Sequence, residues 1–164
     1  MPNGLKTISG ASFANCSSLV NLSIPDSVTT IGNWAFSGCT SLSNVHFSTG
    51  CTLINYSTFR KCGFTSLTIP DNITQCYDYA FADNYNLLTL VVGTGLTSFS
   101  DYIFYNCTSL TSITINAKIT ATGYYANRWF SGCTEVKELS INFATSIDYL
   151  STLLSPMSKP EKVL

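Results

Sequence analysis

The sequence predicts an α/β repeat protein: a solenoid in which each coil of 22–26 residues adds one short strand to a parallel sheet. A first observation is a column of phenylalanines spaced 23, 23, 22, 23 and 26 residues apart, namely Phe13, Phe36, Phe59, Phe81, Phe104 and Phe130. A second is a column of cysteines three residues later, namely Cys16, Cys39, Cys62, Cys107 and Cys133. A period in this range indicates stacked coils, because one such unit cannot bury its own apolar face.

Short alternating runs of apolar residues are the predicted strands. In the first coil Leu22 and Ile24 lie on one side of an extended chain, and Pro25-Asp26 ends the strand because proline lacks a donor and aspartate favours a turn. The runs are Leu22/Ile24, Val45/Phe47, Leu67/Ile69, Leu90/Val92, Ile113/Ile115 and Leu139/Ile141. The segment around each column phenylalanine, written Ala-Phe-x-x-Cys in the second coil and varied in the others, is predicted to wind into a short helical or 3₁₀ turn.

Two irregularities interrupt the columns. The third coil has lost one residue and realigns on Phe64, and Asn84 stands where the other coils have cysteine. Six repeats account for residues 1–143.

The repeat pattern decays after Ile141, and residues 144–157 are predicted to form a C-terminal capping helix. Apolar residues recur there at helical spacing, namely Ile147, Leu150, Leu153, Leu154 and Met157. The alternative is a helix that docks a following domain. Residues 158–164 are polar and are predicted to form a flexible tail.

All seven cysteines fall on columns predicted to face the core. Cys51 and Cys76 occupy positions that hold aliphatic residues in other coils, and the remaining five form the column after the phenylalanines. A free cysteine packs as a small apolar residue, so the pattern favours a stack of thiols. Disulfides between coils are the second interpretation. A structural metal is a weaker one, because His46 is the sole histidine and no Cys-x-x-Cys pair occurs.

Composition limits the classes of partner. Apolar residues make up 45% of the chain, which excludes a disordered protein, and charged residues only 10%. With a net charge of −1 we expect no nucleic-acid partner and no attraction to anionic membranes. No apolar run reaches the roughly 18 residues of a membrane span, so we expect no membrane insertion, and this segment contains no recognisable signal peptide or anchor.

One composite pattern extends across the repeats: Ile-Gly-x-x-Ala-Phe-x-Gly-Cys-x-Ser-Leu-x-x-Ile-x-Ile-Pro-x-Ser-Val. It is matched best by residues 31–42 joined to residues 22–28, and it resembles the BspA-like class of leucine-rich repeat. The resemblance covers roughly residues 5–142. It implies a right-handed leucine-rich-repeat solenoid with a parallel sheet on one face. It also implies a secreted or cell-surface protein of bacteria or parasitic protists that adheres to host proteins or to other cells.

The outward face of the sheet is the first candidate binding site, because solenoids commonly bind through this extended surface. Its central ladder is expected to consist of Ser23, His46, Thr68, Val91, Thr114 and Ser140. This surface is small, neutral and rich in hydroxyl groups, which is equally typical of a solvated strand face without a ligand.

Aromatic residues provide two further candidate sites. Between the fifth and sixth coils, three extra residues make a loop that carries Tyr124, Tyr125, Arg128 and Trp129, a composition typical of binding hot spots. Trp34, Tyr79 and Tyr102 share one column and are expected to line one flank. In both cases the alternative is packing between coils.

The sequence favours a non-catalytic interaction module that adheres to a protein or glycan ligand. No carboxylate accompanies His46 in the ladder to complete a triad, and we expect neither cofactor nor metal. One alternative is a spacer segment of a longer array. A water-ordering, ice-binding surface is disfavoured because the central ladder contains only two threonines. An uncapped N-terminal repeat would also permit end-to-end self-association.

Overall fold

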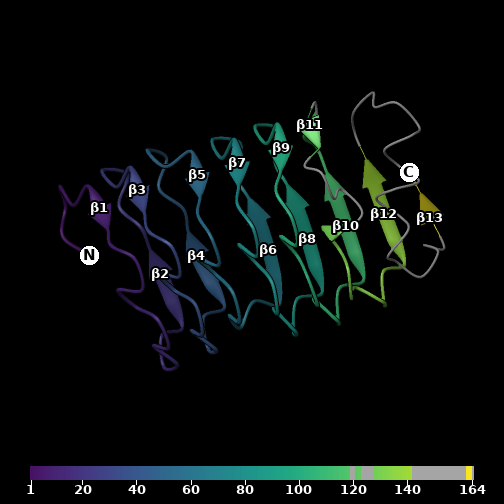
Figure 1. The fold of residues 1–164 in the computed structure, drawn as a ribbon, viewed down its shortest axis with the longest axis horizontal. Helices are drawn as coiled ribbons and strands as arrows, with labels where there is room; N and C mark the ends of the chain where they lie inside the picture. The colour runs from purple at the N-terminus through teal and green to yellow at the C-terminus, as the bar shows by residue number, and fades with distance from the viewer. Residues whose placement is uncertain (119–120, 123–127, 142–161, 164) are drawn as a thin grey trace.

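The computed structural model describes residues 1–118, 121–122, 128–141 and 162–163. Coils stack side by side along the long axis of the molecule, with the first coil at one end (Figure 1). All paired strands are parallel, and Leu22 lies opposite Val45, Leu90 opposite Ile113 and Ile113 opposite Leu139. The parallel solenoid and the register predicted from the phenylalanine column are confirmed.

The strands of three and four residues form the predicted sheet, together with the two-residue β13, but in two parts. One part pairs β2 (Asn21–Ser23) with β4 (Asn44–His46). The other has the order β13-β12-β10-β8-β6 and comprises β6 (Ser66–Ile69), β8 (Thr89–Val92), β10 (Ser112–Ile115), β12 (Glu138–Ile141) and β13 (Lys162–Val163). In β6 exposed and buried residues alternate, as the period of a half-buried strand requires.

Each coil also contributes a second strand of two residues, so the prediction of one strand per coil was incomplete. β1 (Thr7–Ile8) pairs with β3 (Thr30–Ile31), and a four-stranded sheet contains β5 (Leu53–Ile54), β7 (Gln75–Cys76), β9 (Ser98–Phe99) and β11 (Ala121–Thr122). Two residues are too few to show an alternating pattern, and for this reason the sequence did not reveal these strands.

The helical winding predicted for the Ala-Phe segment is wrong for the described residues, which contain no α-helix; a 3₁₀ conformation occurs only at Arg128. Trp34 and Gly38 have positive φ angles of 57° and 78°, which interrupt a right-handed helix. Their N–H groups donate to carbonyl groups of the next coil, Trp34 to Tyr56 and Gly38 to Arg60, at 2.9 and 2.8 Å. Between them, the N–H groups of Ala35 and Ser37 donate to carbonyl groups three residues back, so turns within the coil alternate with bonds between coils and no continuous helix forms. The predicted capping helix, residues 144–157, lies outside the described residues.

A stack of phenylalanine rings forms the centre of the core. Successive rings of the phenylalanine column have centroids 5.2–5.7 Å apart and interplanar angles of 6–11°. This is an offset-stacked arrangement, which aromatic pairs prefer over a face-to-face sandwich. Leucine and isoleucine side chains from the strands pack against the same column, so the core separates the main sheet from the Ala-Phe turns.

The cysteine column joins neighbouring coils by thiol hydrogen bonds. The Sγ of Cys39 donates to the carbonyl of Phe13 at 3.1 Å, and Cys133 donates to Phe104 at 3.2 Å. Asn84 makes the equivalent contact, because its Nδ2 donates to the carbonyl of Phe59 at 3.0 Å. The exception in the column thus keeps the same contact between coils.

All seven cysteines are free thiols, and only Cys16 is exposed. Burial raises the pKa of the Cys62 and Cys76 thiols far above the ordinary value, so these groups are protonated and unreactive at neutral pH. We expect a thiol reagent to modify Cys16 rapidly in the native protein and the other six only on unfolding. Denatured protein without reductant should give seven thiols, and a count of five or fewer would contradict this arrangement.

Candidate functional site

The outward face of the main sheet carries the predicted central ladder. Ser23 lies beside His46 in one part, and Thr68, Val91, Thr114 and Ser140 follow one another in the other. In the flanking column the Nδ2 of Asn44 donates to the Oδ1 of Asn21 at 3.0 Å. The face is therefore neutral along this line, and it is continuous except between His46 and Thr68.

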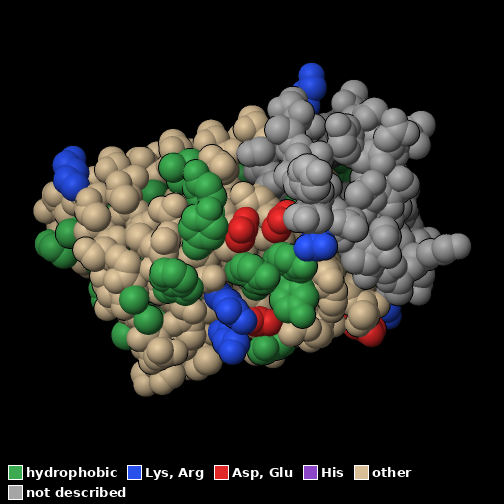
Figure 2. Space-filling model, in the orientation of Figure 1, with side chains coloured by type: hydrophobic (Ala, Val, Ile, Leu, Met, Phe, Trp, Pro, Cys, Tyr) green, Lys and Arg blue, Asp and Glu red, His purple; other side chains and the backbone are tan. Residues whose placement is uncertain are grey.

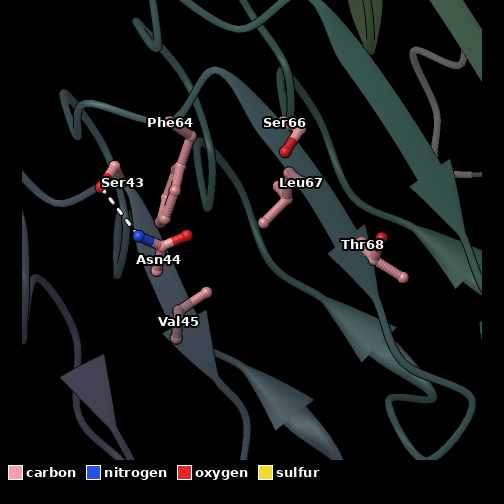
Figure 3. A pocket seen from close by; sticks show the side chains of 7 residues that line it. All are labelled: Ser43, Asn44, Val45, Phe64, Ser66, Leu67 and Thr68. Atoms are coloured by element: carbon pink, nitrogen blue, oxygen red, sulfur yellow. Dashed lines mark hydrogen bonds between the residues drawn. The ribbon is translucent and has the colours of Figure 1, made fainter. Parts of the chain in front are cut away.

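A pocket of about 210 Å³ lies where the sheet is interrupted (Figure 3). It is lined by residues 43–45 on the β4 side and by Phe64, Ser66, Leu67 and Thr68 on the β6 side. The third coil has one residue fewer between Cys62 and its strand, so its backbone approaches the previous coil early and Gly63 N donates to Leu42 O at 3.0 Å. A Cβ at Gly63 would overlap the carbonyl oxygen of Thr40, which explains why glycine occupies this position.

Aromatic side chains gather on another part of the surface, on the turn side of the core. We call this surface the aromatic flank and define it by Trp34, Tyr56, Tyr77, Tyr79, Tyr102 and Tyr105. Trp34 is 51% exposed and Tyr56 is 41% exposed. Figure 2 shows hydrophobic side chains gathered over the middle of the molecule, with basic and acidic side chains between them. Exposed aromatic groups mixed with charges are typical of binding surfaces.

The centre of the aromatic flank is a column of four side chains. The rings of Tyr79 and Tyr102 stack with centroids 5.0 Å apart and an interplanar angle of 8°. The guanidinium of Arg60 lies 5.8 Å from the centroid of Tyr79, and that of Arg128 lies 5.4 Å from the centroid of Tyr102. Tyr105 meets both tyrosine rings edge-on. Each ring is thus fixed in orientation by neighbours from adjacent coils.

A buried carboxylate positions Arg60. Both Nε and an Nη of Arg60 lie 2.7 Å from Asp83 Oδ2, and the side chain of Asp83 is only 4% exposed. The other oxygen of Asp83 accepts a hydrogen bond of 3.1 Å from the Nδ2 of Asn106. Because a buried charge requires such partners, Arg60 and Asp83 hold each other in place, and the guanidinium stays beside Tyr79.

Tyr79 of the flank is neutral at physiological pH. Burial raises the pKa of Tyr79, and the neighbouring Tyr102 and Asp78 raise it further. A neutral phenol both donates and accepts hydrogen bonds, so the flank offers polar contacts as well as apolar ring surface.

The aromatic residues that the sequence predicted to lie together are only partly in contact in the structure. Tyr79 and Tyr102 are in contact, but Trp34 lies two coils from Tyr79, with Ser57 in the intervening position of the column. Trp129 was expected in an exposed loop, and it is instead 4% exposed. Trp129 occupies the position directly before the column phenylalanine. In other coils this position holds the buried residues Ala35, Ala80 and Ile103. Tyr124 and Tyr125 lie outside the described residues.

The comparisons with known proteins identify the repeat. The family model for the BspA type leucine rich repeat region matches six copies, over residues 6–137 and 90–152. The chain belongs to this family. The BspA-type assignment agrees with the resemblance in the Ile-Gly-x-x-Ala-Phe pattern. No curated protein matches the chain.

Several solved structures resemble this BspA-type chain. A leucine-rich repeat protein of T. pallidum superimposes with a TM-score of 0.74 and 20% identity, covering 98% of this chain and 83% of that one. The pneumococcal vaccine antigen PcpA superimposes with a TM-score of 0.75 and 22% identity, covering 99% of this chain and 40% of that one. A leucine-rich cell surface protein of Faecalibacterium prausnitzii superimposes with a TM-score of 0.61 and 27% identity, covering 93% of this chain and 33% of that one. The chain therefore spans two-fifths or less of the length of the last two proteins.

Sequence reasoning missed several residues of the BspA-type surface. Arg60 and Asp83 have opposite charges and are 23 residues apart, one more than the local spacing of Phe59 and Phe81, so the signal for this contact lay between different columns of the repeat. The pocket was signalled only by the missing residue of the third coil. Among the described residues, none of the segments forms a helix of the length and hydrophobicity that crossing a membrane requires.

Proposed function

We propose that this chain is a non-catalytic interaction module that binds a protein ligand through the aromatic flank, in an adhesive role at a cell surface. The observation that carries the proposal is the pairing of Tyr79 and Tyr102 between two arginines. The exposed ring of Trp34 adds a further aromatic contact group two coils away. Tryptophan, tyrosine and arginine are the residue types most enriched in binding hot spots.

Rigidity of the flank supports this choice over the sheet face. The stacked rings and the Arg60–Asp83 pair fix the orientation of the contact groups before binding, so little side-chain entropy would be lost on association. The sheet face offers mainly short hydroxyl side chains, which provide less contact area for a protein ligand. The leucine-rich cell surface protein that resembles this BspA-type chain supports a location at the cell surface, where an interaction module would act in adhesion.

Binding to immobilised matrix proteins, namely collagen, laminin, fibronectin and fibrinogen, would test the proposal. We expect specific binding by the native chain and a loss of about 2 kcal/mol, or roughly a 30-fold rise in Kd, for Tyr79→Ala/Tyr102→Ala. Trp34→Ala is a less invasive variant because its side chain is half exposed.

A matched control is Ser23→Ala/His46→Ala on the sheet face, which should bind like the native chain. If this control lost binding while the flank variants retained it, the site would lie on the sheet. A folded chain that bound none of the four proteins would favour the alternative of a spacer segment within a longer array.

A further inference from the structure

We propose that the pocket between β4 and β6 binds a single neutral sugar residue. The site is separate from the aromatic flank, and its ligand class differs from the protein ligand proposed above. Its basis is a concave site with an apolar floor, a rim of neutral polar groups and one polar side chain held in a fixed orientation (Figure 3).

The interruption of the sheet creates the site. β4 pairs with β2, and β6 pairs with β8, but in the part of the chain described these two ladders are not joined. Where neighbouring strands are paired, their outward side chains lie directly beside one another, as Thr68 lies beside Val91. At the β4–β6 junction the shortened third coil leaves about 210 Å³ open between the strands. The pocket thus lies at a junction where the strands are not paired.

Asn44 is oriented toward the opening. Its Nδ2 donates both to Asn21 Oδ1 at 3.0 Å and to Ser43 Oγ at 3.1 Å. These two bonds use both amide hydrogens, so the group that Asn44 can offer to a ligand is its carbonyl oxygen. Figure 3 shows this oxygen on the side that faces β6. A side chain held in this way loses little freedom when it accepts a hydrogen bond.

The chemistry of the lining selects the ligand class. The rim consists of the Asn44 amide and the hydroxyls of Ser66 and Thr68, and no charged residue lines the pocket. Hydroxyl groups both donate and accept hydrogen bonds, which matches the hydroxyls of a sugar. A carboxylate or an ammonium would lose its hydration without a charged partner. Val45 is half-buried and provides the accessible apolar surface, with the buried side chains of Phe64 and Leu67 behind it. This surface suits the C–H face of a pyranose ring.

The volume favours one residue of a polymer over a larger ligand. Pockets for drug-sized molecules have volumes of roughly 300–1,000 Å³, and this pocket is smaller. A glycan could place one sugar in the pocket while its neighbours extend over the hydroxyl-rich sheet face. Single-sugar affinity would then be weak, and multivalent display of glycans would strengthen it.

The test is a titration of the full chain, followed by amide chemical shifts, with the methyl glycosides of glucose, galactose, mannose and N-acetylglucosamine. At least one glycoside should shift amides of residues 43–47 and 64–68. Asn44→Ala and Thr68→Val should each raise the Kd of that glycoside about 3- to 10-fold, the effect of one lost hydrogen bond. Thr114→Val is the matched control, because Thr114 occupies the same outward column between two paired strands and should bind normally.

Two further probes separate the alternatives. N-acetylneuraminic acid tests the requirement for neutrality and should leave the pocket amides unshifted. A neutral peptide, acetyl-Thr-Val-Thr-Val-amide, tests whether the open strand edges accept an extended chain instead. The proposal is overturned if no glycoside shifts these amides at millimolar concentration, if Thr114→Val weakens binding as much as Thr68→Val, or if only the peptide binds.

Discussion

Phe104→Ala is expected to lower the free energy of unfolding by about 3–5 kcal/mol, the range for removal of a buried aromatic side chain. Phe104 is fully buried, and its ring stacks on Phe81 at 5.7 Å and on Phe130 at 5.2 Å. Alanine would leave a cavity between two coils and remove both ring contacts. Because coils of a solenoid contact only their neighbours, the ring stack is a principal term of each interface between coils. Chemical denaturation monitored by circular dichroism measures the change.

Ser23→Ala is the control for this experiment. Ser23 lies exposed on the sheet face, so its replacement should change the free energy of unfolding by less than about 0.5 kcal/mol. Equal and small losses in the two variants would mean that the phenylalanine column does not occupy the core as described.

Gly95→Ala should destabilise the chain by about 3 kcal/mol, at the upper end of the usual cost of overpacking. A Cβ at Gly95 would overlap the carbonyl oxygen of Asp71 and would lie 2.8 Å from its carbonyl carbon. Both are backbone atoms, so no side chain can move aside to relieve the overlap. The neighbouring coils meet here closely, because Thr94 N also donates to Asp71 Oδ1 at 2.6 Å.

Thr94→Ala is the matched control in the same turn. The side chain of Thr94 is exposed, and its backbone N–H remains available to Asp71 after the substitution. We expect the control to unfold within about 0.5 kcal/mol of the native chain. A Gly95→Ala variant as stable as this control would show that the fourth coil is not seated on the third at this turn.

The parts of the fold that repeat in sequence could be predicted. The phenylalanine and cysteine columns give the register, because stacking on identical neighbours requires the same residue type in each coil. The left-handed backbone at Trp34, Tyr79 and Tyr102 could not be predicted, because none of these residues is a type that favours positive φ. These angles replace the predicted helical turn with bonds between coils.

The candidate surfaces were predictable only in part. The outward ladder follows from period-two alternation, whereas the burial of Trp129 depends on which side of the phenylalanine column it occupies. The Arg60–Asp83 pair joins residues in different columns of the repeat, one just after the phenylalanine and one a position later. A contact between different columns does not appear when each column is considered alone.

Both sheets are interrupted at the same junction, between β3 and β5 and between β4 and β6. The core nevertheless continues there, because the rings of Phe36 and Phe59 stack at 5.4 Å as they do elsewhere. The length of a coil can therefore differ by one residue without a change in the alignment of the core. In evolutionary terms, small deletions provide such an array with a means to alter its surface locally while every repeat keeps the same interior.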